Sequence, residues 1–101
     1  MNTPLEIRYL KTAEKDMDDI FDYIAKDNPH AAVSLLEKFD NSISKLAHNP
    51  ESGIVPKDVR LKELGYRMLI IGNYLIFYVI KPKTVQIRRV IHGARQYKNH
   101  L

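Results

Sequence analysis

Apolar side chains recur at helical spacing in two stretches of the first half of the chain. The first stretch carries Ala13, Met17, Ile20, Phe21 and Ile24, and the second carries Ala32, Leu35, Leu36, Phe39, Ile43 and Leu46. Stripes with this period predict two amphipathic helices. We expect Thr12 to cap the first helix and Asn28, which precedes Pro29, to cap the second. Because the link between them is short, the helices should pack as an antiparallel hairpin.

The second half consists of strand-like apolar runs that are separated by turn residues. Three strands are predicted between residues 65 and 92, with tight turns at Gly72-Asn73 and at residues 81–83. A short alternating run at residues 5–10 predicts a first strand, and residues 50–60 are predicted to form a loop. The order β-α-α-β-β-β predicts one α+β domain over residues 1–101, with the helical hairpin on one face of an antiparallel sheet.

The predicted strands carry more apolar residues than one covered face requires. Even positions hold Met68, Ile70, Ile76, Tyr78 and Ile80, and odd positions hold Leu69, Ile71, Leu75, Phe77 and Val79. A helical hairpin covers only one of the two faces. We therefore expect a partner chain to cover the second face through contacts with Leu69, Ile71, Leu75 and Phe77. The alternatives are a lined cleft, a twist of the strands, or a chain end that folds back over this face.

Composition narrows the classes of function. The net charge of +4 combines −3 in residues 1–50 with +7 in residues 51–101, which indicates either a surface for a polyanion or a solvated basic face. The chain has no Cys, and its four His residues are scattered without ligand spacing, so we expect neither a metal nor a cofactor. We see no membrane-spanning run and no signal-peptide pattern, and we therefore expect a cytoplasmic protein without a membrane partner.

Basic and aromatic residues gather after the last predicted strand. Strict alternation would place Gln86, Arg88, Val90 and His92 on one face and Arg89 on the other, so we assign Arg88 to a surface patch. Arg95, Tyr97, Lys98 and His100 follow within a few residues. Such a cluster suits phosphate binding and base stacking, or phosphodiester cleavage with Arg stabilising charge and His or Tyr moving protons. For His92 we prefer a structural role at the Gly93 turn.

Several short motifs occur together in this order of elements. They are Asn49-Pro50-Glu51-Ser52-Gly53, Gly65-Tyr66-Arg67, Tyr74-Leu75-Ile76-Phe77-Tyr78 and Val90-Ile91-His92-Gly93-Ala94-Arg95. Through these motifs and its order of elements, the chain resembles the RelE/ParE superfamily of toxins from bacterial type II toxin–antitoxin modules. The resemblance covers nearly the whole chain. The resemblance implies a toxin neutralised by an antitoxin that is encoded beside it. It also implies that the complex binds promoter DNA only through the antitoxin.

Two branches of this superfamily have different targets. The RelE branch cuts mRNA on the ribosome; in this chain Arg67, Arg95 and Tyr97, assisted by His92 or His100, would form such a site. Leu75 departs from that pattern, because it stands where the nucleases carry an Arg. The sequence around Leu75 looks more like the ParE branch, and we favour that branch. ParE toxins poison DNA gyrase and are not known as nucleases. Its contact surface would include Arg88, Arg95, Lys98 and His100. A non-toxic nucleic-acid-binding module on the same fold is a third interpretation.

Overall fold

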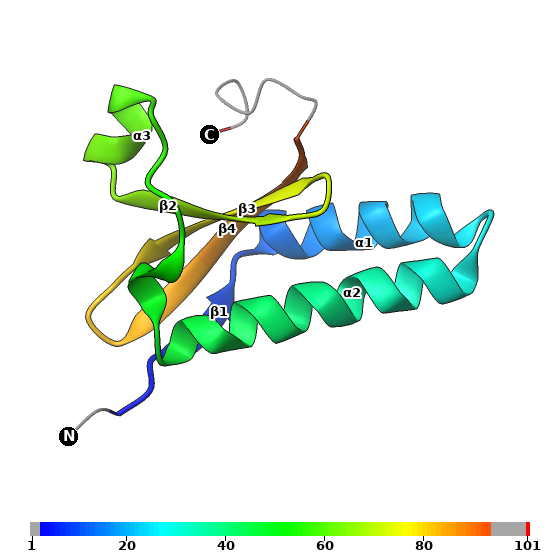
Figure 1. The fold of residues 1–101 in the computed structure, drawn as a ribbon, viewed down its shortest axis with the longest axis horizontal. Helices are drawn as coiled ribbons and strands as arrows, with labels where there is room; N and C mark the ends of the chain where they lie inside the picture. Colours follow the sequence, from blue (N-terminus) through cyan, green and yellow to red (C-terminus); the bar gives the residue numbers. More distant parts are fainter. Residues whose placement is uncertain (1–2, 94–100) are drawn as a thin grey trace.

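The fold is a four-stranded sheet with two long helices on one face and a short helix on the other (Figure 1). The computed structural model describes residues 3–93 and 101. The elements are β1 (Glu6–Tyr9), α1 (Lys11–Ala25), α2 (Pro29–Ser44), the 3-10 turns η1 (Lys45–Ala47) and η2 (Pro50–Ser52), α3 (Val59–Glu63), β2 (Tyr66–Ile71), β3 (Tyr74–Ile80) and β4 (Thr84–His92). The predicted α+β fold is therefore confirmed.

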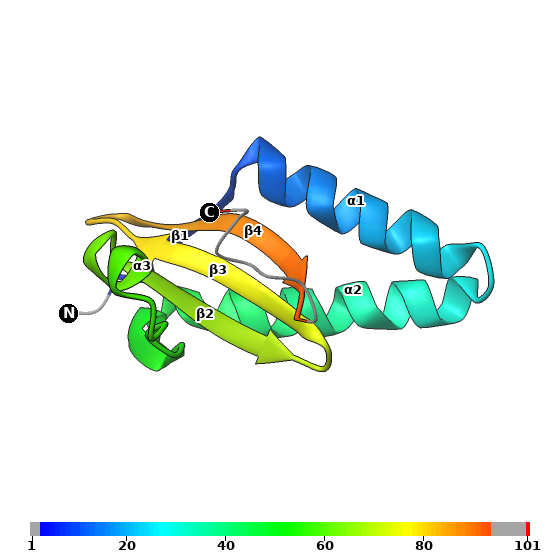
Figure 2. The same cartoon turned by 90° about the horizontal axis from the view of Figure 1, so that it is seen from above.

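The sheet is antiparallel except at one edge. Its strand order is β1-β4-β3-β2, and β1 pairs with β4 in parallel. Figure 2 shows β2, β3 and β4 side by side, with α1 and α2 extending beyond the end of the sheet. The predicted antiparallel sheet is thus confirmed for β2, β3 and β4, whereas β1 is parallel to β4.

The two predicted helix caps have different outcomes. Asn28 is the cap of α2, because its side-chain oxygen accepts a hydrogen bond from the backbone N–H of Ala31 at 3.1 Å. The residue before α1 is Leu10 and not Thr12, so the prediction for Thr12 is wrong. The Thr12 hydroxyl instead donates to the carbonyl of Arg88 at 3.0 Å and thereby ties the start of α1 to β4.

The turn at Gly72-Asn73 decides which face each strand residue occupies. Gly72 has a φ of 58°, which suits glycine at the first position of a two-residue hairpin turn. A two-residue turn pairs an odd position with an even one, so Leu69 lies opposite Ile76. Leu69 and Ile71 consequently pack against the helix-covered core, whereas Leu75 packs on the second face. The prediction that Leu69, Ile71, Leu75 and Phe77 share one face is wrong.

The second face has a core of its own, which we call the second core. It consists of Leu61, Tyr66, Phe77, Val79 and Ile91, with Met68, Leu75 and Leu101 packed against it. Leu61 comes from α3, which forms within a segment partly predicted to be loop and is capped by Asp58, whose carboxylate accepts from the Leu61 N–H at 3.0 Å. The surplus of apolar strand residues is therefore largely buried within the chain itself.

We expect Leu61→Ala to lower the free energy of unfolding by about 2–5 kcal/mol, because it removes a side chain with no exposed surface from the second core. Urea denaturation followed by circular dichroism measures this change. Leu64→Ala is the matched control, since Leu64 lies just after α3 and is 56% exposed. It should shift the free energy by less than about 0.5 kcal/mol. Equal effects of the two substitutions would contradict a core role for α3.

Candidate functional site

A β-bulge in β4 brings two adjacent arginines to the same side of the sheet. The register pairs Phe77 with Arg89 but Tyr78 with Ile87, so Arg88 is an extra residue on β4. The guanidinium carbon of Arg88 lies 5.7 Å from the centre of the Tyr66 ring, which belongs to the second core. Arg89 lies opposite Phe77 of the same core. The prediction that Arg88 and Arg89 point to opposite faces is wrong.

The bulge also changes the face of the residues that follow it. Val90 is buried in the helix-covered core, beside Val85 and Ile87. The predicted alternation of Gln86, Arg88, Val90 and His92 on one face therefore stops at the bulge.

Arg89 forms a two-point ion pair with Asp16 of α1. Its Nε donates to Oδ2 at 2.7 Å and its Nη2 donates to Oδ1 at 2.9 Å. The same carboxylate also accepts from the backbone N–H of Val90 at 3.0 Å. Hydrogen bonding to Asp16 raises the pKa of Arg89. Asp16 thus joins the helical layer to the part of β4 that extends beyond its pairing with β1.

Arg88 has a less complete set of partners. Its Nη2 donates to the side-chain oxygen of Gln86 at 3.0 Å. Its Nε is buried and has no hydrogen-bond partner within residues 3–93 and 101. The planar cation also lies over the Tyr66 ring. Arg88 therefore holds a positive charge at the second core that no described carboxylate neutralises through a salt bridge.

Arg67, a predicted catalytic residue, is engaged with the loop that precedes α3. Its Nη1 donates to the carbonyls of Glu51 and Gly53, each at 3.1 Å. The neighbouring Tyr78 hydroxyl donates to the carbonyl of Pro50 at 2.7 Å and accepts from the N–H of Gly53 at 2.9 Å. Burial raises the pKa of Tyr78, so its hydroxyl keeps the proton that it donates. In this arrangement Arg67 anchors a loop.

His92 lies at a different place on the sheet from Arg67. Its ring meets Tyr74 edge-on with centroids 5.2 Å apart. His92 pairs with Tyr74 and Arg67 pairs with Tyr78, so they are separated by four residues along β3, or about 13 Å. The adjacent turn is held by a backbone hydrogen bond from Gly93 to the carbonyl of Asn73 at 2.6 Å. The structure therefore does not bring these two candidates together.

The remaining predicted site residues fall into two groups. Arg95, Tyr97, Lys98 and His100 lie outside the described residues. Of the four predicted antitoxin contacts, Phe77 has no exposed surface, and Leu69, Ile71 and Leu75 are half-buried. Leu75 supplies no cation at its position on β3.

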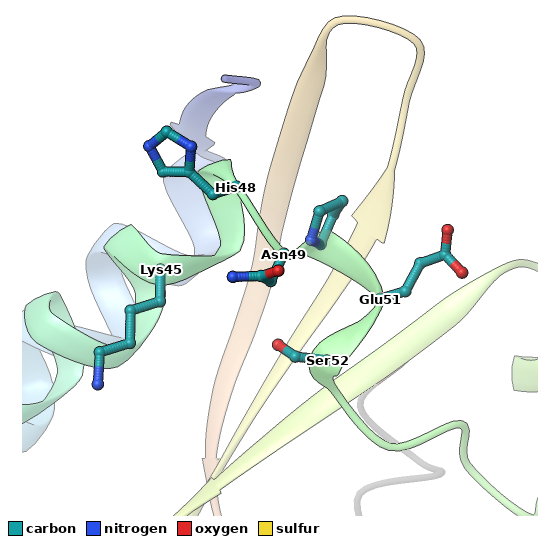
Figure 3. A pocket seen from close by; sticks show the side chains of 6 residues that line it. Lys45, His48, Asn49, Glu51 and Ser52 are labelled. Atoms are coloured by element: carbon teal, nitrogen blue, oxygen red, sulfur yellow. The ribbon is translucent and has the colours of Figure 1, made fainter. Parts of the chain in front are cut away.

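A shallow hollow of about 520 Å³, which the sequence did not predict, lies beside η2. It is lined by Lys45, His48, Asn49, Pro50, Glu51 and Ser52. Figure 3 shows that Glu51 points away from Lys45 and His48, so the ionisable side chains that line the hollow do not converge on one point. Within residues 3–93 and 101 no group of three or more His, Asp and Glu side chains lies close enough to hold a metal ion.

Charge separates between the two layers of the molecule. Residues 11–44, which form α1, α2 and their link, carry four lysines and eight carboxylates, a net charge of −4. Residues 53–93, which include α3 and the strands β2, β3 and β4, carry eight Lys or Arg and two carboxylates, a net charge of +6. The basic half of the sequence is thus the sheet layer of the fold. In the described part of the chain no helix is long and apolar enough to cross a membrane.

Comparison with known proteins gives the family. The model of the ParE toxins of type II toxin–antitoxin systems, from the parDE modules, matches residues 7–97. The chain belongs to the ParE toxin family. It is 32% identical over 91 residues to Y4kP, a candidate toxin of Sinorhizobium fredii, and this match covers 90% of the chain and 91% of the relative.

Solved structures share the ParE fold of this chain. A chain of the chromosomal ParDE system of P. aeruginosa superposes with a TM-score of 0.74 at 19% identity, covering 89% of this chain and 97% of that one. A chain of the RelBE2 toxin–antitoxin complex of Mycobacterium tuberculosis gives a TM-score of 0.61 at 23% identity, covering 94% and 98%. Both show that this chain has the same fold as those chains.

The Asp16–Arg89 pair should be a stability element of the ParE fold. We expect Asp16→Asn to lower the free energy of unfolding by about 2–3 kcal/mol, because it removes the charge from a half-buried pair that also holds the Val90 N–H. Thermal and urea unfolding measure the loss.

Asp19→Asn is the matched control on α1, since Asp19 pairs with Lys15 at 3.2 Å on an exposed surface. Its cost should be at most about 0.5 kcal/mol. A loss for Asp16→Asn no larger than that of the control would contradict the role of the pair.

Proposed function

We propose that this ParE-family toxin arrests bacterial growth by acting on DNA gyrase, and that a cognate antitoxin neutralises it. The match to the ParE toxin model over residues 7–97 carries the proposal. The structural relative from M. tuberculosis was solved as a toxin–antitoxin complex, which supports an antitoxin partner for this chain. A gyrase target would place the protein in the cytoplasm.

The geometry of the described residues favours protein contact over nuclease chemistry. Phosphodiester cleavage needs cations and a proton carrier within reach of one phosphate. Arg67 donates to two loop carbonyls, His92 lies about 13 Å further along the sheet, and Leu75 supplies no charge. These placements support a toxin that acts by binding. A RelE-like ribosome-dependent mRNA endonuclease is the alternative, favoured by the structural likeness to the RelBE2 chain.

Induction of the toxin alone should stop growth of a bacterial culture, and co-expression of the protein encoded beside it should restore growth. The reason is that a ParE-type antitoxin occupies the surface through which the toxin binds its target. Colony counts after induction and after rescue measure both effects. A harmless toxin whose nucleic-acid binding falls steeply with salt would instead favour the non-toxic binding module.

The target can be assigned with purified, antitoxin-free toxin in two parallel reactions. We expect loss of supercoiling by gyrase and accumulation of cleaved DNA, because binding traps the enzyme on its substrate. In the second reaction, with mRNA-programmed ribosomes, we expect the message to remain uncut in primer extension. Codon-phased cuts in the ribosomal A site, together with unaffected gyrase, would reject the gyrase proposal and establish the endonuclease.

A further inference from the structure

Two adjacent arginines present the same guanidinium edge to different partners. In Arg89 the Nε and Nη2 atoms each donate to one oxygen of the Asp16 carboxylate, at 2.7 and 2.9 Å. In Arg88 the Nη2 atom alone has an acceptor among residues 3–93 and 101, the amide oxygen of Gln86 at 3.0 Å. Its Nε is buried without a partner in the described part of the chain. Both donors on this edge of Arg89 therefore have acceptors, whereas one of the two donors on the same edge of Arg88 has none among the described residues.

This difference is costly for the isolated toxin. A buried donor without an acceptor has given up its hydrogen bond to water and gained none in return, and the cost is larger when the group carries a charge. Most buried donors in folded proteins have a partner, so an exception requires an explanation. Arg88 also lies on the layer whose residues 53–93 carry a net charge of +6. Both features point to an anionic group that is contributed from outside the chain.

We propose that Arg88 binds an aspartate or glutamate side chain of the antitoxin through its Nε and Nη2 atoms, as Arg89 binds Asp16. The inference rests on the proposed neutralisation by an antitoxin. Gln86 then acts as a placeholder: its amide oxygen accepts from Nη2 in the free toxin and gives way to a carboxylate, whose two oxygens satisfy both donors. In the free toxin Nε has almost no accessible surface, so the antitoxin carboxylate reaches it only when Gln86 moves aside and opens this edge of the guanidinium.

Three features favour a protein carboxylate over a nucleic-acid phosphate. A planar carboxylate matches the planar Nε and Nη2 edge. The Tyr66 ring beneath the guanidinium and the apolar second core around it suit a protein segment. The Asp16 carboxylate next to Arg89 would repel a phosphate backbone that runs across both arginines. A second copy of the chain is disfavoured, because it would place two basic layers together.

The test uses purified toxin variants and the antitoxin encoded beside the toxin, with dissociation constants from calorimetry. Arg88→Gln should weaken binding roughly 30-fold or more, because it removes one partner of a water-excluded charge pair. Arg88→Lys should not restore binding, since an ammonium lacks the two-donor edge. Lys83→Gln is the matched control: it removes one positive charge from an exposed turn of the same layer and should change binding less than about 2-fold. Unfolding curves check that each variant is folded.

A second measurement identifies the partner side chain and does not depend on the folding of Arg88→Gln. Each Asp and Glu of the antitoxin is replaced in turn by Asn or Gln and titrated against unmodified toxin. One of these variants should weaken binding as strongly as Arg88→Gln and should add little to it when the two are combined.

Binding of Arg88→Gln within 3-fold of the unmodified toxin, or no antitoxin variant with a 10-fold loss, would overturn the inference and leave neutralisation intact. If Arg88→Gln instead loses binding to duplex DNA or RNA while its affinity for the antitoxin is unchanged, the inference is overturned. The anion that Arg88 binds would then be a nucleic-acid phosphate. Failure of the unmodified toxin to bind the antitoxin would reject the proposed neutralisation as well.

Discussion

A sheet whose central strand is apolar on both faces has to be buried on both faces, and the rest of this small fold follows from that requirement. Phe77 and Tyr78 are neighbours on β3, point to opposite sides and have no exposed surface. Burial of such a side chain stabilises the fold by about 1.5–3 kcal/mol. The helical hairpin covers Tyr78, and the chain must then return over the other face so that Leu61 of α3 covers Phe77. The segment between α2 and β2 is therefore a structural cover with a defined path.

The start of that cover is fixed by polar contacts around Gly53. The Tyr78 hydroxyl joins Pro50 and Gly53, and Arg67 joins Glu51 and Gly53. A side chain at position 53 would meet the Tyr78 hydroxyl and would lie 2.9 Å from the carbonyl oxygen of Met68, closer than real contacts allow. This packing explains why Arg67, whose position in the sequence suits phosphate binding, serves the fold. A cation that already donates to two carbonyls is a poor candidate for stabilising charge that develops elsewhere.

The sequence predicted what depends on neighbours along the chain and missed what depends on pairing across the sheet. The helical stripes, the Asn28 cap and the Gly72 turn are local and correct, whereas the Thr12 cap is a local prediction that is wrong. The faces of Leu69 and Ile71 depend on the two-residue turn, which pairs odd positions of β2 with even positions of β3. Counting odd and even positions along the chain does not include this shift. The bulge left a signal in β4, because the positions buried in the helix-covered core change from odd (Val85, Ile87) to even (Val90) around Arg88. Helix α3 left almost none, since five residues with a single buried side chain are too few for a period.

The two bulge arginines show how one local distortion divides similar side chains between folding and recognition. Asp16 belongs to the same chain as Arg89, so the stabilisation from their pair is gained on folding and is present in every state of the folded toxin. Within residues 3–93 and 101, Arg88 gains one acceptor on folding, the Gln86 amide oxygen, and keeps one buried donor without a partner. In our proposal the carboxylate that completes this edge comes from the antitoxin, and its stabilisation is then gained only on binding. In this proposal the folded toxin carries, beside its second core, a cost that a correctly charged partner removes.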